Sequence, residues 1–354
     1  MALVFALCAM LWGIGALMKA PKSARLLMIG VLYVAVLGLH VALPDGHPLR
    51  MATGESPALW LILGGFAVLA VIYRSVLTKL RARAAEAEQQ TQASSPNAPI
   101  FNETELNRYA RHMVLREIGG PGQKRLKEAR VLVIGAGGLG APALQYLAAA
   151  GVGTIGVIDD DIVENANLQR QVIHRDKSIG MPKVFSAQEA MEAQNPYVTV
   201  RPYQRRLTAD IATELFGEYD LVLDGTDNFD TRYLANAAAV AAGIPLISGA
   251  LSQWEGQLSV FDPAQDAPCY QCVFESAPAA DLAPSCAEAG VVGPLPGVIG
   301  AMMAVEAIKE ITGAGTVLRG HMVIYDALYG ESRTLVVKRR PDCPICGTLN
   351  AKAS

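Results

Sequence analysis

The sequence has few histidines, no excess of basic residues and no basic segment ahead of its first apolar run. Its 354 residues include 30 Lys and Arg against 33 Asp and Glu, for a net charge of −3. This balance argues against a broad nucleic-acid-binding surface, so no nucleic-acid partner is expected. The five histidines are scattered without the spacing of a metal site or a catalytic triad. Without a basic start, the N-terminus does not resemble a cleaved signal peptide.

Hydrophobic residues are concentrated in the first 80 residues. Three apolar runs without Asp, Glu, Lys or Arg occur there, at residues 2–18, 26–43 and 58–73. Their lengths approach or reach the roughly 17–25 residues of a membrane-spanning helix. The segments after the first and third runs are basic, whereas the loop at residues 44–57 is not. We therefore predict a transmembrane region of about three helices in residues 1–80, with the N-terminus outside and everything after Tyr73 in the cytoplasm. The alternative is a buried helical hairpin in a soluble domain.

A second domain is predicted after a linker. Residues 81–101 begin as a polar helix and continue into Ser, Asn and Pro, which is typical of a linker. In residues 102–350 strand-like apolar runs alternate with helical patterns, and the runs include "ARVLVIGAG", "TIGVIDDD", "DLVLDGTDN" and "IPLISGA". Near-continuous apolar runs are expected of parallel strands that are covered on both faces. We predict an α/β fold with a doubly wound, Rossmann-like sheet.

A glycine-rich turn follows the first of these runs. Gly135, Gly137 and Gly140 fit the pattern G-x-G-x-x-G, Gly138 lies between them, and Asp159 ends the next strand. Small residues let backbone N–H groups approach phosphates, and the N-terminus of the following helix adds positive potential. An acid after the second strand suits a ribose. The pattern indicates a nucleotide but leaves its chemistry open, and a tight turn without a ligand is the alternative.

Two cations and a carboxylate favour a triphosphate over NAD. Arg170 and Lys183 follow the ribose acid, and Asp227 lies beyond the end of a later strand. Arginine forms a bidentate fork to phosphate oxygens, and lysine supplies a movable point charge. Asp227 is placed where a magnesium-binding carboxylate would face the phosphates. Alternatively, each cation is a solvated surface charge and Asp227 caps the next helix.

The six cysteines include two C-x-x-C pairs. Four thiolates from two such pairs suit a tetrahedral structural zinc site, and a cytoplasmic location disfavours disulfides. Cys8 falls in an apolar run, where we expect it to be inert. Cys286, in the Gly- and Pro-rich stretch "PSCAEAGVVGPLPG", is either a nucleophile or a packing residue. The predicted zinc ligands are Cys269, Cys272, Cys343 and Cys346.

The motifs together resemble the ubiquitin-activating-enzyme-like adenylyltransferases. The resemblance is carried by "RYARHMVLREIG", "VLVIGAGGLG", "NLQRQVIH", "GMPK", "LVLDGTDN", "CYQC", "CAEAGVVGPLPGVIG" and "CPIC", in that order over residues 102–348. The most similar branch is that of the molybdopterin-synthase and thiamine-biosynthesis adenylyltransferases. The resemblance implies that the protein uses ATP to adenylate the C-terminal Gly-Gly carboxylate of a small ubiquitin-like sulfur carrier, with release of pyrophosphate.

The resemblance also implies roles for positions that match the family's nucleotide site. Gly138 lies in the phosphate turn, and Asp159 would hold the ribose. Asn167, Arg170 and Lys183 would hold the triphosphate.

Further matching positions imply a magnesium ion, a homodimer and a sulfur acceptor. Asp227 would bind Mg²⁺, with Asn228 beside it. Arg111 matches the family arginine that enters the active site of the partner subunit, so a homodimer is implied. Cys286 matches the acceptor cysteine, which forms a sulfur-linked intermediate in some family members and is dispensable in others.

Three other functions are compatible with parts of the pattern. A tRNA-modifying dehydratase of the same superfamily would need a basic RNA-binding face. An NAD-dependent oxidoreductase would need a proton donor and a hydride-acceptor site, which the sequence does not indicate. A membrane scaffold that only retains the fold would not need Arg170, Lys183 and Asp227. The N-terminal apolar segment is not part of the family pattern, so the identity of the carrier stays open.

Overall fold

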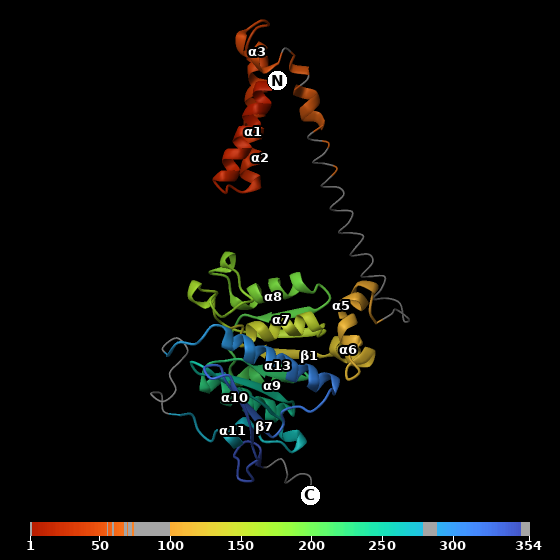
Figure 1. Ribbon diagram of the computed structural model, residues 1–354, viewed down its shortest axis with the longest axis vertical. Coiled ribbons are helices and arrows are strands. Elements are labelled where there is room, and N and C mark those ends of the chain that lie inside the picture. Colours follow the sequence, from red (N-terminus) through yellow and green to blue (C-terminus); the bar gives the residue numbers. More distant parts are fainter. Residues whose placement is uncertain are drawn as a thin grey trace. The chain divides into compact units, whose positions relative to one another are not determined.

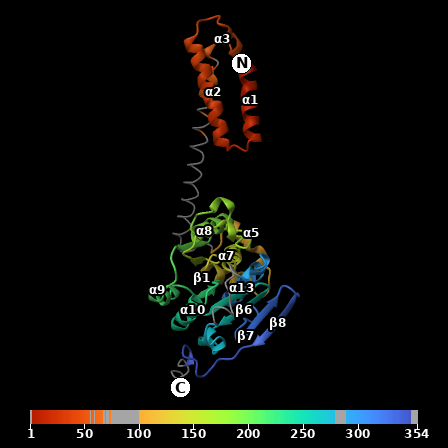
Figure 2. The same ribbon diagram turned by 90° about the vertical axis from the view of Figure 1, so that its left-hand side faces the viewer.

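The chain divides into two compact units. The computed structural model describes residues 2–54, 56–58, 60–66, 69, 73, 100–278 and 289–347. The units are Met1–Ala98 and Pro99–Ser354 (Figures 1 and 2). Cys286, almost all of the predicted linker and part of the third apolar run lie outside the described residues.

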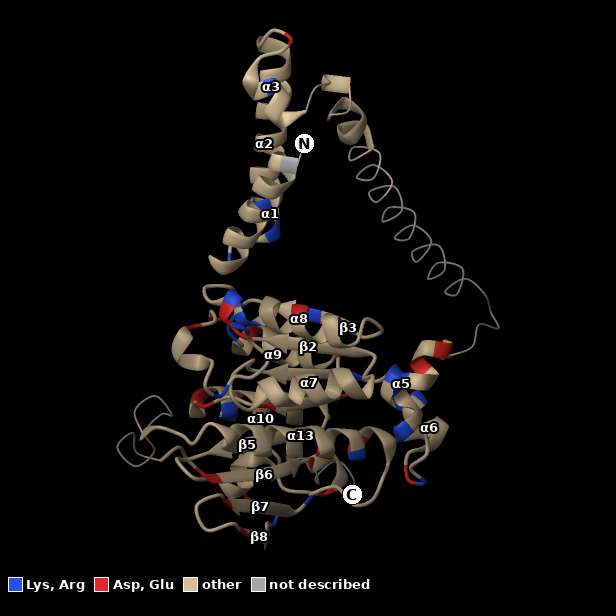
Figure 3. Cartoon of the chain, turned by 45° about the horizontal axis from the view of Figure 1, so that its top comes forward, with Lys and Arg blue, Asp and Glu red and all other residues tan. Residues whose placement is uncertain are grey.

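The N-terminal unit contains two long apolar helices, α1 (Ala2–Leu17) and α2 (Lys22–Ala42). They lie side by side in Figures 1 and 2, and the Arg25 side chain donates a 2.8 Å hydrogen bond to the Ala20 carbonyl at their connection. Basic residues colour the connection end of this helix pair in Figure 3, and most of the helical surface is uncharged. Among the described residues, α2 alone is long and apolar enough to cross a membrane by length and composition.

A short helix occupies the segment that sequence analysis assigned to a loop. This helix, α3 (Pro48–Thr53), starts at Pro48, a residue that suits the first position of a helix because it lacks an N–H. The Trp60 indole donates to the Thr53 carbonyl at 3.2 Å, and Thr53 Oγ1 lies 3.1 Å from His40 Nε2. These polar contacts join α3 to α2 and to the helical residues 60–66.

The second unit is built on one eight-stranded sheet. The strand order is β3-β2-β1-β4-β5-β6-β7-β8. The strands are β1 (Arg130–Ile134), β2 (Thr154–Ile158), β3 (Thr199–Tyr203), β4 (Leu221–Asp224), β5 (Leu246–Leu251), β6 (Glu255–Phe261), β7 (His321–Asp326) and β8 (Glu331–Val336). Neighbouring strands from β3 to β5 are parallel, and those from β5 to β8 are antiparallel. The predicted doubly wound α/β sheet is therefore confirmed, and the antiparallel extension is an addition.

Helices cover both faces of the parallel part. Side chains alternate along β1, so Val131 and Val133 join one buried cluster whereas Leu132 and Ile134 join the other. The first cluster includes side chains of α7 (Gly140–Ala150), α8 (Lys183–Gln194) and α13 (Pro294–Thr312), and the second includes side chains of α9 (Ala209–Phe216), α10 (Phe229–Ala242) and α11 (Tyr270–Val273). This two-sided burial explains the continuous apolar runs in the sequence.

Two further helices precede β1, α5 (Glu103–Met113) and α6 (Gly119–Glu128). Asn102 and Glu105 form a capping box at the start of α5, in which each side chain accepts from the other residue's backbone N–H. Glu105 is also paired with Lys127 of α6 at 2.5 Å. The chain thus enters the α/β unit through a well-defined helix start.

The strand order reverses between β1 and β4, which are adjacent in the sheet but separated by β2 and β3 in the sequence. The two connections leave their strands in opposite directions there, so a crevice opens beyond the carboxyl ends of the strands. The fold therefore places its binding site next to the glycine-rich turn after β1.

Candidate functional site

A pocket of about 780 Å³ lies at the carboxyl ends of the parallel strands. It is lined by the turn after β1, the acids after β2, the segments after β3 and β4, and the facing ends of β5 and β6. Of the predicted nucleotide-binding residues, the following line it: Gly135, Gly137, Gly138, Asp159, Arg170, Lys183, Asp227 and Asn228.

Each glycine of the turn is required for a different structural reason. Gly135 has a φ of +89°, a left-handed conformation that side chains rarely adopt. A Cβ on Gly140 would lie 1.8 Å from the Gly135 carbonyl oxygen, so Gly140 allows α7 to pack against the turn and does not line the pocket. Gly137 and Gly138 form part of the pocket wall, where the backbone can approach a ligand closely.

Asp159 is held in place by two backbone donors. Its Oδ2 accepts from Ala136 N–H and its Oδ1 from Asp161 N–H, each at 2.8 Å. Burial raises the pKa of Asp159, although Lys183 and the two N–H groups oppose that shift. Each oxygen keeps a lone pair for a ligand hydroxyl.

Both predicted cations line the same pocket as the glycine turn. The Arg170 Cδ would lie 3.8 Å from a Cβ built on Gly138, and its guanidinium donates to the Ala166 carbonyl at 3.3 Å. Lys183 begins α8, and its Nζ contacts Asp161 Oδ2 at 2.7 Å. The Lys183 side chain is only 7% exposed, so it is well fixed before any ligand binds. Asn167 lies on the same segment as Arg170 but does not line the pocket.

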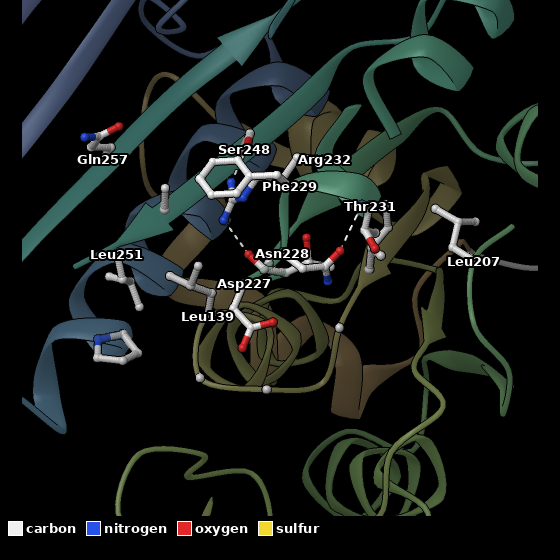
Figure 4. Close-up of a pocket in the computed structure, with 18 of the residues that line it drawn as sticks. Leu139, Leu207, Asp227, Asn228, Phe229, Thr231, Arg232, Ser248, Leu251 and Gln257 are labelled. Atoms are coloured by element: carbon white, nitrogen blue, oxygen red, sulfur yellow. Dashed lines mark hydrogen bonds between the residues drawn. The ribbon is translucent and has the colours of Figure 1, made fainter. Parts of the chain in front are cut away.

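The two residues after β4 have separate roles. Asn228 caps α10, because its Oδ1 accepts from the backbone N–H of Thr231 at 2.9 Å. The capping alternative for Asp227 is therefore wrong, and the cap belongs to its neighbour. Figure 4 shows the Asp227 carboxylate pointing away from Ser248 and Arg232, and Asp227 is an exposed residue of the pocket lining.

A buried ion pair behind this loop was missed by sequence analysis. Arg232 of α10 lies 3.6 Å from Asp224, and both side chains are almost completely buried. Arg232 also donates to Ser248 Oγ at 3.2 Å (Figure 4) and to the Thr226 carbonyl. Thr226 Oγ1 in turn donates to Asp224 at 2.6 Å. A buried charge needs such compensation, and here it fixes the loop that carries Asp227.

The pocket extends past the part that is lined by the glycine turn, Arg170 and Lys183. Its further lining comes from β5, β6, α13 and the segment just before α13, and includes Ala250, Leu251, Gln257, Val291 and Pro296. Ser248 and Glu255 lie in the same part. This extension offers room for a second, elongated ligand next to a nucleotide.

Two arginines that sequence analysis missed also line the pocket, Arg205 and Arg206. They follow β3, which ends at Tyr203. Their position just after a parallel strand could have indicated that they line the site. Arg111 is exposed on α5 and does not line the pocket of its own chain. Cys286 lies outside the described residues.

The two C-x-x-C pairs come together in space. The Sγ–Sγ distances are 3.8 Å for Cys269–Cys272, 3.6 Å for Cys269–Cys343 and 3.4 Å for Cys272–Cys346. A tetrahedron with Zn–S bonds of about 2.3 Å has edges of about 3.8 Å, so the donor set fits Zn²⁺. The backbone N–H of Arg340 donates to Cys272 Sγ at 3.4 Å, as expected around a thiolate.

The thiol pKa values indicate that this cluster needs compensating positive charge. Burial raises the pKa of Cys269, with Cys272 and Cys346 adding to the shift, and raises the pKa of Cys346 to about 11. Burial acts in the same direction on Cys343, but hydrogen bonds from the Cys346 and Ile345 N–H groups outweigh it and lower the pKa to about 7. Four buried thiolates repel one another unless a cation lies between them.

Comparison with known proteins places these features in a family. The ThiF family model matches residues 109–345. A sulfur carrier protein adenylyltransferase of Thermus thermophilus is 50% identical over 251 residues, which are 70% of this chain and 93% of that protein. The molybdopterin-synthase adenylyltransferase of Salmonella typhimurium is 45% identical over 247 residues, or 70% of this chain and 98% of that protein. The probable adenylyltransferase/sulfurtransferase MoeZ of Mycobacterium tuberculosis is 49% identical over 252 residues, or 70% of this chain and 64% of that protein.

Solved structures show the same fold at lower identity. Escherichia coli MccB with AMPCPP and MccA has a TM-score of 0.62 and 24% identity, with 70% of this chain and 75% of that chain covered. PaaA has a TM-score of 0.60 and 21% identity, with coverages of 76% and 87%. The long matches at high identity and the matching fold lead to one conclusion: the chain belongs to the ThiF family.

Proposed function

We propose that the protein uses ATP to adenylate the C-terminal Gly-Gly carboxylate of a small ubiquitin-like sulfur carrier, with release of pyrophosphate. The observation that carries this proposal is the convergence of Arg170, Lys183 and Asp227 with a glycine turn on one pocket. The names of the similar adenylyltransferases, which include sulfur carrier and molybdopterin-synthase enzymes, support the same reaction.

The chemistry requires charge neutralisation and no general base. A C-terminal carboxylate has a pKa of about 3.3–3.7 and is ionised at neutral pH. It attacks the α-phosphorus of ATP, a new C–O–P linkage forms, and the bond to pyrophosphate breaks. The obstacle is the repulsion between one anion and a polyanion, and catalysis consists of in-line positioning and compensation of charge.

The pocket residues divide this task between them. The backbone of Gly137 and Gly138 would contact phosphates, and Asp159 would accept hydrogen bonds from the ribose hydroxyls. Arg170 and Lys183 would neutralise the triphosphate. Asn167, three residues before Arg170, would assist them. The pocket beside β5 and β6 would hold the extended tail of the carrier.

A divalent cation fits the residues after β4. No described side chain donates a hydrogen bond to the Asp227 carboxylate, and it is exposed to the pocket. Magnesium accepts such a carboxylate together with phosphate oxygens and waters. Asp227 would hold Mg²⁺, which supplies positive charge to the phosphates. Asn228 uses its side-chain oxygen for the helix cap and would support the loop from beside the ion.

Replacing Lys183 tests the reaction. Lys183→Ala removes a fixed cation, so ATP–pyrophosphate exchange dependent on a Gly-Gly carrier is expected to fall by roughly 10²–10³-fold. The matched control is Lys177→Ala, because Lys177 is 77% exposed and contacts Glu189 only at 3.8 Å. Circular dichroism verifies that both variants fold. Equal activity of the two variants, or wild-type protein that binds NAD but not ATP, argues against the proposal.

Arg111 is proposed to act in the pocket of a second copy. It is exposed on α5 and does not line its own pocket. A two-fold symmetric dimer would exchange such residues between subunits, so that each pocket receives the Arg111 of the partner subunit. The protein would then be a homodimer with two composite sites.

Mixing two inactive variants tests this arrangement. Arg111→Ala and Lys183→Ala are each expected to be inactive. Random mixing makes half of the dimers mixed, and each of those has one intact pocket, so about a quarter of the wild-type activity is expected. The exchange assay after co-expression measures it. Activity no higher than that of either variant alone would mean that Arg111 does not act across subunits.

The cysteine cluster is proposed to bind a structural Zn²⁺. Four thiolates fill a tetrahedral shell and leave no position for substrate, so the metal would stabilise the fold without taking part in adenylation. It would join residues 343–346 to residues 269–272. Cys286 is not a ligand in this scheme and stays a predicted acceptor cysteine.

Metal analysis tests the zinc site. Wild-type protein is expected to contain about one Zn²⁺ per chain, and Cys346→Ser to lose most of it because three ligands hold the ion less tightly. Elemental analysis after dialysis gives the zinc content, and the thermal midpoint of the variant is expected to fall by several degrees. Cys8→Ser is the matched control and keeps its zinc. Full zinc content in Cys346→Ser contradicts the assignment.

The N-terminal unit is proposed to anchor the enzyme in the cytoplasmic membrane by several spans, with the α/β unit in the cytoplasm. In α2, only 11% of the most apolar 18-residue window is buried. Leu27, Val34 and Val41 are 70%, 66% and 83% exposed, and such a surface suits lipid better than water. The basic residues between α1 and α2 would face the cytoplasm.

Membrane fractionation tests the anchor. The full-length chain is expected to sediment with membranes and to resist extraction with alkaline carbonate. The double variant Val31→Arg and Val34→Arg is expected to be extracted more readily than the wild type, since each arginine costs about 2.5–3.5 kcal/mol at a helix centre. Val305→Arg is the control, because Val305 is an exposed residue of α13. Wild-type protein that carbonate releases into the soluble fraction contradicts membrane anchoring.

A further inference from the structure

His174 connects the glycine turn with the helix that carries Lys183. Its side chain is only 4% exposed and does not line the pocket. One ring nitrogen, Nε2, lies 2.9 Å from the Ala136 carbonyl oxygen in the turn. The other, Nδ1, lies 2.9 Å from Ser186 Oγ in α8. The imidazole is therefore a bridge between two parts of the site that are 38 and 12 residues away from it in the sequence.

The partners of the ring define its protonation state. The Ala136 carbonyl carries no hydrogen, so His174 Nε2 must be the protonated donor. Nδ1 then accepts from the Ser186 hydroxyl in the neutral ring, and both nitrogens are satisfied. Burial lowers the pKa of His174, which favours this neutral form. The ring thus has one fixed tautomer and orientation, without the ability to rotate freely between alternatives.

The two peptide groups on either side of the Ala136 Cα are each held by one hydrogen bond. Its N–H donates to Asp159 Oδ2 at 2.8 Å, and its carbonyl accepts from His174. The next residues, Gly137 and Gly138, form the pocket wall. Rotation of either peptide group would break the hydrogen bond that it makes, so the orientation of both is fixed before a ligand arrives.

The same ring also fixes the position of α8. Ser186 lies three residues after Lys183, about one helical turn along α8. The hydrogen bond from Ser186 to His174 therefore ties the Lys183 end of α8 to the turn. The separation between the backbone of the turn and the Lys183 ammonium group is set by this connection and by the Asp161 contact.

We propose that His174 is a positioning residue that aligns the glycine turn and Lys183 for one triphosphate. This inference rests on the proposed use of ATP. His174 does not touch the nucleotide. It acts through Ala136 and Ser186, so its loss weakens ATP binding and leaves recognition of the carrier unchanged.

Three variants and direct ATP-binding measurements test this role. His174→Phe removes the donor to Ala136 and leaves a buried carbonyl unpaired, so the Kd for a non-hydrolysable ATP analogue is expected to rise roughly 10- to 100-fold. The KM for the carrier at saturating ATP is expected to change less than about twofold. In His174→Gln the amide Nε2 replaces the ring donor, and most of the affinity is expected to return. Ser186→Ala is expected to raise the Kd by roughly 3- to 10-fold, because it removes only the link to α8.

The outcomes separate this inference from the proposed function. Wild-type protein without ATP affinity or pyrophosphate exchange removes the proposed function itself. Active wild-type protein with unchanged Kd in His174→Phe overturns the positioning role alone. If His174→Phe does not fold, the folded Gln and Ser186→Ala variants decide. Loss of carrier affinity in parallel with ATP affinity, or a Gln variant as weak as Phe, would mean that His174 only supports the fold.

Discussion

Charge compensation at the carboxyl edge of the sheet is the constraint on which the site depends. Carboxylates gather there, and the two buried cations at this edge are each already paired with one of them. Lys183 contacts Asp161 at 2.7 Å, and Arg232 is paired with the buried Asp224. Arg170 instead donates to a carbonyl, so its charge is the more available to an incoming anion. Binding of a triphosphate would therefore require Lys183 to be shared between Asp161 and a phosphate, and a divalent cation at Asp227 would offset the remaining negative charge.

Much of the fold was predictable because its parallel half has a local signature. Strands that are buried on both faces need continuous apolar residues, and the turn after β1 needs glycine at Gly135 because φ is positive there. The antiparallel half has no comparable signature. All six residues of β8 (Glu331–Val336) are exposed, and their strand conformation depends on pairing with β7. Similarly, the loop that was predicted between two apolar runs contains α3, whose hydrogen bonds to His40 and Trp60 involve residues distant in the sequence.

Site residues could be predicted from the sequence when they line the pocket themselves and follow closely after a strand. Gly138, Asp159 and Asp227 meet that condition, and the structure brings them to one pocket. Residues that act through others lack such a signal. Arg232 is eight residues beyond Asp224, and His174 is 38 residues beyond Ala136, so only the folded chain reveals these contacts. Gly140 is required for helix packing in addition, because a Cβ there would collide with the Gly135 carbonyl oxygen.

The cysteine cluster belongs to the same architecture as the pocket. Tyr270 lies between Cys269 and Cys272, lines the pocket, and its backbone N–H donates to Asn236 Oδ1 of α10 at 2.8 Å. The cysteines of the C-terminal segment therefore hold a wall of the pocket through residues 269–272. A Zn²⁺ bound there would restrain this wall from a distance, as the Asp224–Arg232 pair restrains the Asp227 loop. A buried ion pair fixes the geometry in one place, and a Zn²⁺ among four thiolates would fix it in the other. The exposed groups that they support remain available for a ligand.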